Sequence, residues 1–171
     1  RSWVIVNFLL STGIRQNSLI NIKIKDLDFD NDMVYINTTK NRKSLIIPLN
    51  EDIVKILHEY LKYRGGGSED WLFCSIYGEK MTKGANYTAL WDYSHSRGLD
   101  KTGVHRYRHT FAKKWVTMGG SIVTLQKILG HSSLAITEGY LNMLTTDLKK
   151  DMNEINIIRS LKQERMQIVR H

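Results

Sequence analysis

The stretch VHRYRHTFA, residues 104–112, is the densest group of imidazole and guanidinium side chains in the chain. Apolar residues recur from there at helical spacing until Gly119-Gly120, which predicts a helix. The apolar stripe comprises Val104, Tyr107, Phe111, Trp115 and Met118. His105 and Arg108 share one face of that helix, because they are three residues apart. An imidazole that moves a proton beside a guanidinium that holds two oxygens suits a phosphate-binding site.

Helical patterns also flank this segment on both sides. Residues 2–10 are apolar nearly all round, which predicts a helix buried on several sides. We expect further helices after Asn50, from Thr82 to Arg97 with Leu90 and Trp91 inward, and after Ser121. The helix after Ser121 would bury Ile122, Leu125, Ile128 and Leu129 and stop at Gly130. A short helix from about residue 133 and a final amphipathic helix carrying Ile155, Ile158, Leu161 and Ile168 complete the expected set.

Three β segments lie between the first two expected helices. Residues 25–29, 33–38 and 44–48 are separated by turn-forming residues at 30–32 and 40–43, which predicts a meander of two hairpins. Pro48, the only proline, closes the last strand. The sequence therefore predicts an α+β fold: one mainly α-helical domain over residues 1–171 with a small three-stranded antiparallel sheet.

The composition favours an anionic partner. The chain has 171 residues with 25 Lys+Arg against 17 Asp+Glu, a net charge of +8, and a pI near 9.6. A polyanion such as DNA or RNA is the natural partner for such a chain. The single cysteine, Cys74, excludes a disulfide scaffold and is compatible with a reducing, cytoplasmic compartment. The apolar stretch 3–10 is too short for a membrane span, which needs about 20 residues.

Two other short motifs carry groups suited to a phosphate. LGHSS, residues 129–133, follows a helix stop with His131, and Tyr140 comes nine residues later. TGIR, residues 12–15, places Arg15 just after a helix break. A zinc site on His105 and the histidine four residues later is disfavoured, because Arg106 stands where a zinc protease needs a glutamate. We therefore expect no metal and no cofactor.

Taken in order, these motifs resemble the catalytic domain of the tyrosine recombinase (phage integrase) family. The resemblance spans about residues 8–143 and rests on TGIR, a lysine-bearing β turn that runs into Ile-Ile-Pro-Leu, HRYRHTFA, LGHSS and the following tyrosine. It implies that Tyr140 is the nucleophile that forms a 3′-phosphotyrosyl bond with DNA. The family often has an acidic residue three positions after the first arginine, where this chain has Ser18.

The same resemblance implies a role for each remaining site residue. Arg15 and Arg108 would hold the non-bridging phosphate oxygens, and His131 would hydrogen-bond the phosphate. His105 would exchange the tyrosine proton. Lys40 would be the general acid for the leaving 5′-oxygen, with Lys43 close enough in the sequence to be the alternative.

The resemblance also implies partners and leaves alternatives open. We expect duplex DNA, a homo-tetramer assembled on paired sites, and accessory DNA-bending proteins, but no membrane. The alternatives are strand relaxation as by a type IB topoisomerase, a relative that binds DNA without cutting, and a metal-dependent nuclease. Residues 144–171 match no motif and would form a helical tail, either docked on a neighbouring subunit or folded onto its own core. The family's separate N-terminal DNA-clamping domain is not expected within these residues.

Overall fold

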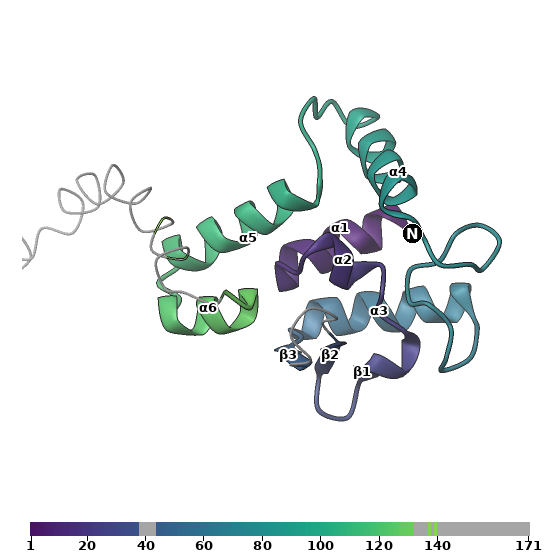
Figure 1. Cartoon of the computed structure of the whole chain (residues 1–171), viewed down its shortest axis with the longest axis horizontal. Coiled ribbons are helices and arrows are strands. Elements are labelled where there is room, and N and C mark those ends of the chain that lie inside the picture. Colours follow the sequence, from purple (N-terminus) through teal and green to yellow (C-terminus); the bar gives the residue numbers. More distant parts are fainter. Residues whose placement is uncertain (38–43, 132–136, 138, 140–171) are drawn as a thin grey trace, which may run out of the picture.

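The computed structural model describes residues 1–37, 44–131, 137 and 139. Its helices and strands are α1 Ser2–Thr12, α2 Gln16–Leu19, the 3₁₀ turn η1 Ile24–Asp26, β1 Leu27–Asp28, β2 Met33–Asn37, β3 Ser44–Pro48, α3 Glu51–Arg64, α4 Lys83–His95, α5 Val104–Thr117 and α6 Ile122–Leu129 (Figure 1). The α+β class with a three-stranded antiparallel sheet is confirmed. Within the described ranges, no helix has both the length and the apolar character needed to cross a membrane.

Helix α1 is the centre of the fold. It packs against α3, α4 and α5, and buries Val4, Ile5, Phe8, Leu9 and Thr12 (Figure 1). Edge-to-face packing of Phe8 on Phe73, with centroids 5.5 Å apart, ties it to the loop after α3. The predicted helix is confirmed, although Trp3 is 51% exposed and Leu10 38% exposed, so one side of α1 faces outward.

The sheet lies beside α3 in the order β1-β2-β3, and both pairings are antiparallel. Val34 and Ile36 alternate with exposed positions along β2, so one face of the sheet joins the core. The predicted first strand is present but shorter than residues 25–29, since only Leu27–Asp28 pairs. The backbone N–H groups of Ile24 and Lys25 instead donate to the carbonyls of Asp70 and Ser68, at 2.9 and 2.8 Å. Residues 38–43, which include the second predicted turn, lie outside the described residues.

The predicted helix caps are confirmed and two predicted core residues are wrong. The predicted caps Asn50 and Ser121 each accept a hydrogen bond from a backbone N–H in the first turn of the helix that follows, and Thr82, which was not predicted as a cap, does the same for α4. Trp91 is 41% exposed and stacks on His95, because only the stripe of α4 that carries Leu90 packs inward. Met118 is 83% exposed, because it comes after the last turn of α5.

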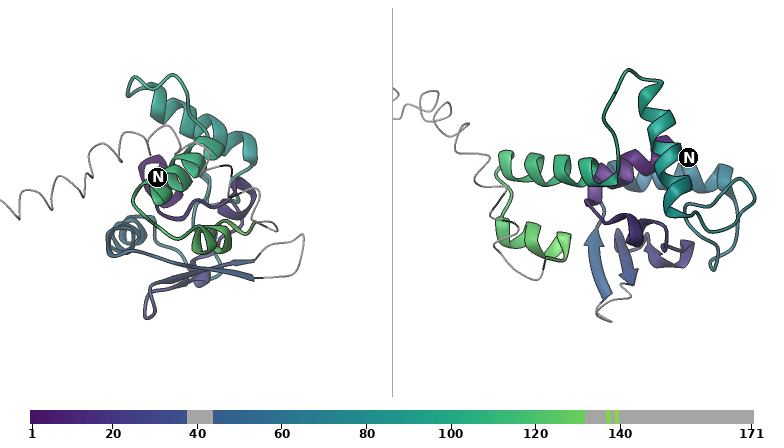
Figure 2. Two further views of the ribbon diagram at one scale, coloured as in Figure 1. Left: turned by 90° about the vertical axis from the view of Figure 1, so that its left-hand side faces the viewer. Right: turned by 45° about the horizontal axis from the view of Figure 1, so that its top comes forward.

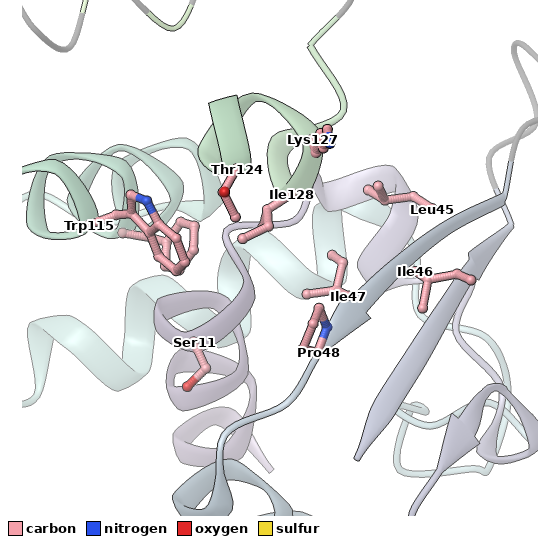
Figure 3. Close-up of a pocket in the computed structure, with 10 residues that line it drawn as sticks. Ser11, Leu45, Ile46, Ile47, Pro48, Trp115, Thr124, Lys127 and Ile128 are labelled. Atoms are coloured by element: carbon pink, nitrogen blue, oxygen red, sulfur yellow. The ribbon is translucent and has the colours of Figure 1, made fainter. Parts of the chain in front are cut away.

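Helices α5 and α6 form a second, smaller core at one end of the molecule (Figure 2). Its buried members are Phe111, Ala112, Val116, Leu125 and Leu129. A mainly apolar hollow of about 320 Å³ lies between this pair and strand β3. Leu45–Pro48 line one side, and Trp115, Thr124, Lys127 and Ile128 line the other (Figure 3).

Gly13 ends α1 in the left-handed conformation, with φ of +61°. We expect Gly13→Ala to lower the free energy of unfolding by about 2–4 kcal/mol, since a Cβ would be strained by the backbone and would overlap the Phe111 ring. Gly119→Ala is the matched control, because Gly119 also has positive φ but open space around it; its loss should be about 1–2 kcal/mol. Urea denaturation measures both, and equal losses would show that the Phe111 contact is unimportant.

Candidate active site

The turn between α1 and α2 brings Arg15 to the site. Leu9 and Gly13 close the last turn of α1 with a 2.9 Å hydrogen bond between the Leu9 carbonyl and the Gly13 N–H. Arg15 then stands as the N-cap residue of α2. The Gln16 amide donates to the Lys83 carbonyl at 2.8 Å, so α2 is fastened to the start of α4. The position of Arg15 is therefore set by the glycine that stops α1 and by this link.

Arg108 is the buried cation of the site, with only 7% of its surface exposed. Its Nη1 donates to the Gly13 carbonyl at 2.7 Å and its Nη2 donates to the Leu129 carbonyl at 2.8 Å. Both acceptors lie at helix C-termini, where partial negative charge gathers. One guanidinium thus joins the ends of α1 and α6, which are far apart in the sequence.

His131 follows the glycine that ends α6. Gly130 has φ of +59°, and the His131 N–H donates back to the Gln126 carbonyl at 3.1 Å, which closes the helix end. The His131 ring then lies with Nε2 2.8 Å from Arg108 Nη2 and Nδ1 2.9 Å from Thr137 Oγ1. Burial, followed by the charges of Arg108 and Arg15, lowers the pKa of His131 to about 4. The imidazole is therefore neutral near neutral pH.

Arg15 reaches the C-terminal end of α6 from the solvent-exposed side of the site. Both of its Nη atoms lie 3.4 Å from the Gly130 carbonyl, and its side chain is exposed. Ser18 replaces the acidic residue expected three positions later, and among the described residues no carboxylate pairs with Arg15. An exposed guanidinium held only by long bonds to one carbonyl retains donors for an incoming oxyanion.

His105 occupies the first turn of α5, exposed and one turn before Arg108. A cluster of three hydroxyls fastens that end of the helix: Ser94 on α4 lies 2.8 Å from both Thr102 and Tyr107, and Thr102 lies 3.0 Å from Tyr107. Ser94 is buried and comes from α4. The cluster therefore sets where α5 begins and, with it, the placement of His105 and Arg108.

The structure brings together Arg15, Arg108 and His131, and it places His105 on the same helix as Arg108. Lys40 and Tyr140 lie outside the described residues, as does Lys43. Thr137, which contacts His131, was missed by the sequence analysis. The only signal for it was a hydroxyl residue three positions before Tyr140.

The segment that carries most of these groups is strongly cationic. Residues 101–137 contain six Lys and Arg and no Asp or Glu. The ion pairs formed by Lys23, Lys25, Lys55, Lys62 and Arg64 fall between residues 23 and 70, on η1, α3 and the neighbouring loops. These pairs lie away from α5 and α6, and the excess of basic residues over residues 101–137 favours contact with a polyanion.

Comparison with known proteins identifies the family. The phage integrase family matches residues 1–147, and the chain belongs to that family. Among curated relatives, the tyrosine recombinase XerA of Saccharolobus solfataricus is 32% identical over 148 residues, which is 86% of this chain and 48% of the relative. The tyrosine recombinase XerC of Staphylococcus epidermidis is 31% identical, in a match that covers 88% of this chain and 52% of the relative. The chain thus spans about half the length of the curated relatives it matches.

Solved structures agree in fold. The crystal structure of a XerA recombinase matches with a TM-score of 0.80 at 31% identity, covering 91% of this chain and 57% of that one. A XerH site-specific recombinase bound to a palindromic difH substrate, in a post-cleavage complex, matches with a TM-score of 0.75 at 26% identity, covering 88% and 44%. The transposon Tn1549 integrase in complex with a circular intermediate DNA has a TM-score of 0.68 at 26% identity, covering 81% and 53%.

The two arginines should differ sharply in their effect on stability. Arg108→Met leaves the Gly13 and Leu129 carbonyls without this donor, so we expect a loss of about 2–4 kcal/mol in the free energy of unfolding. Arg15→Met, the same chemical change at an exposed position, should cost no more than about 0.5 kcal/mol. Denaturant unfolding of both variants tests this, and a similar cost at both positions would contradict it.

Proposed function

We propose that this chain is the catalytic domain of an enzyme that breaks and rejoins duplex DNA at specific sites. The observation that carries the proposal is the convergence of Arg15, Arg108 and His131, from three separate segments, on the end of α6. Two guanidiniums can hold both non-bridging oxygens of a phosphodiester and stabilise the charge that develops there in the transition state. The names of the relatives support recombination over simple strand relaxation.

The chemical step assigned to Tyr140 is a transesterification. The phenol oxygen attacks the phosphorus, an O–P bond to tyrosine forms, and the bond from phosphorus to the 5′-oxygen breaks. A tyrosine phenol in water has a pKa of about 10, so it needs a proton acceptor near neutral pH, and His105 takes that role. Because the phosphoester stores the cleaved bond, a 5′-hydroxyl from another strand can reverse the step without ATP.

The leaving 5′-oxygen needs a proton, because an alkoxide is a strong base. We assign that proton to Lys40, with Lys43 as the alternative donor; both lie outside the described residues. The arginines and the lysine supply the positive charge that the transition state requires, so the proposed reaction uses no divalent metal.

The proposal extends to how the chain acts on DNA. We propose double-stranded DNA as its partner, in a homo-tetramer that holds two sites together, with accessory DNA-bending proteins. A protein of this kind would integrate or excise a mobile element, as the likeness to a transposon integrase suggests. The acid-free segment 101–137 would lie against the phosphate backbone, since neutralisation of phosphates dominates such binding.

Residues 144–171, outside the described residues, are proposed to link the subunits. Their sequence has apolar residues at helical spacing, among them Ile155, Ile158 and Leu161. The hollow between β3, α5 and α6 offers an apolar surface on each subunit (Figure 3). We propose that the tail of one copy docks into this hollow on a second copy.

Covalent capture tests the nucleophile. The chain is mixed in EDTA with nicked duplexes taken from the DNA that flanks its gene, quenched with SDS and examined for protein attached to DNA. We expect an adduct with the wild type and none with Tyr140→Phe, because phenylalanine has no attacking oxygen. An adduct that survives this substitution, or one that EDTA abolishes, would contradict the proposal.

A second arm of the same experiment separates Lys40 from Lys43. A substrate with sulfur in place of the bridging 5′-oxygen has a leaving group that needs no proton, since a thiol has a pKa of about 8.5. Lys40→Ala should lose the adduct with the oxygen substrate and regain it with the sulfur substrate, whereas Lys43→Ala should resemble wild type with both. The reverse pattern would assign the role to Lys43.

Synapsis tests the tail. We expect Ile158→Asp with Leu161→Asp to abolish complexes of four chains on two duplexes, because charges would face an apolar hollow. Asn156→Asp with Gln163→Asp adds the same charge at polar positions and serves as the control. Analytical ultracentrifugation of the protein–DNA complexes measures assembly, and covalent capture on a single nicked site shows whether each variant remains competent. Normal assembly by the apolar-face variant would rule out docking by the tail.

A further inference from the structure

Both ring nitrogens of His131 have partners, and the partners differ in kind. Nε2 lies 2.8 Å from Arg108 Nη2, and Nδ1 lies 2.9 Å from Thr137 Oγ1. Thr137 is completely buried, so its hydroxyl is held against the ring away from bulk water. Replacing the hydroxyl with a methyl would leave Nδ1 without this partner.

The partners fix the tautomer of the imidazole. A guanidinium has donors and no acceptor, so Nε2 can contact Arg108 only through its lone pair. In a neutral ring the proton is then on Nδ1, and Nδ1–H donates to Thr137 Oγ1. The depressed pKa of His131 agrees with a neutral ring.

This tautomer is the opposite of the one that phosphate binding requires. Under the proposed function, on which this inference rests, Nε2 must carry a proton to donate to a phosphate oxygen. Nδ1 then becomes the acceptor. The ring stays neutral and exchanges one proton at each nitrogen with solvent, so no charge is gained or lost.

A hydroxyl is suited to both tautomers. A carboxylate or a carbonyl at this position would only accept and would hold the proton on Nδ1, whereas an amide N–H would only donate. A threonine hydroxyl accepts in one state and donates in the other through rotation of its hydrogen, with no movement of Oγ1.

We propose that Thr137 is a positioning residue that lets His131 change tautomer when a phosphate binds. Without DNA, Thr137 accepts from Nδ1 while Arg108 donates to Nε2. With a phosphate present, Nε2 turns from acceptor to donor and Thr137 donates to Nδ1. Because Tyr140 follows three residues later, the same hydrogen bond ties the phosphate-binding imidazole to the chain segment that carries the nucleophile.

Nitrogen NMR of the histidine side chains tests the proposal in the full chain, because protonated and unprotonated ring nitrogens have well-separated shifts. His131→Asn identifies the signal. In the DNA-free wild type we expect a proton on Nδ1. In a Tyr140→Phe background, which cannot cleave, an added duplex should move the proton to Nε2. A wild-type ring protonated on Nε2 before DNA is added would overturn the proposal.

Two variants separate positioning from packing. Thr137→Val keeps the shape and loses the hydroxyl, whereas Thr137→Ser keeps the hydroxyl and loses a methyl. We expect Thr137→Ser to show the tautomer change and adduct formation within about threefold of wild type. Thr137→Val should show an incomplete change and slow adduct formation by about tenfold or more, the scale on which a misplaced group affects reactivity. Equal behaviour of the two variants in both assays would overturn the proposal.

The outcomes also distinguish this inference from the proposed function. If DNA binding changes the tautomer but the wild type forms no adduct, the cleavage chemistry is overturned and the proposed role of Thr137 at the phosphate stands. A wild-type adduct without a tautomer change would overturn the role of Thr137 alone. Absence of both would overturn the two together.

Discussion

The site depends on the hydrogen bonds that the buried guanidinium of Arg108 makes. It spans from the Gly13 carbonyl at the end of α1 to the Leu129 carbonyl at the end of α6, at 2.7 and 2.8 Å. A buried charge is costly unless its donors are satisfied, and two helix C-termini offer carbonyls with partial negative charge for this purpose. These hydrogen bonds hold the α5–α6 pair, which has its own small core, against the main core. The turn after α1, which carries Arg15, then faces the turn after α6, which carries His131.

Sequence predicted the elements of this arrangement better than their contacts. Helix limits followed from local signals, such as the Asn50 and Ser121 caps and the left-handed glycines at positions 13 and 130, which act within a few residues. The first strand was overestimated, because residues 24 and 25 give their backbone donors to a loop over 40 residues away in sequence. No local pattern reports such a partner. The prediction that Trp91 points inward was wrong for a related reason, since the spacing of apolar residues does not show how wide a stripe of α4 is covered by its neighbours.

In the site as well, the residue types could be predicted from the sequence but their contacts could not. Arg15, Arg108, His105 and His131 could be nominated from motif order, but the burial of Arg108 could not, because an arginine beside two histidines on a helix is equally compatible with a solvated face. The only sequence signal for Thr137 is its place three residues before Tyr140, which does not reveal a role. Its role becomes visible only when the ring nitrogens of His131 have named partners.

The electrostatics of the site explain why a neutral imidazole belongs between two arginines. Before an anion binds, Arg108 and Arg15 add to burial in lowering the pKa of His131, so the ring does not add a third positive charge. Under the proposed function, an anionic phosphate would accept a hydrogen bond from Nε2, so the ring would stay neutral while its proton moves from Nδ1 to Nε2. The position of the His131 proton, rather than the charge of the ring, would therefore depend on the presence of phosphate. Under the proposed function, the neutral ring would become a hydrogen-bond donor when the anion arrives, while the two arginines, which are charged throughout, would attract the anion in advance.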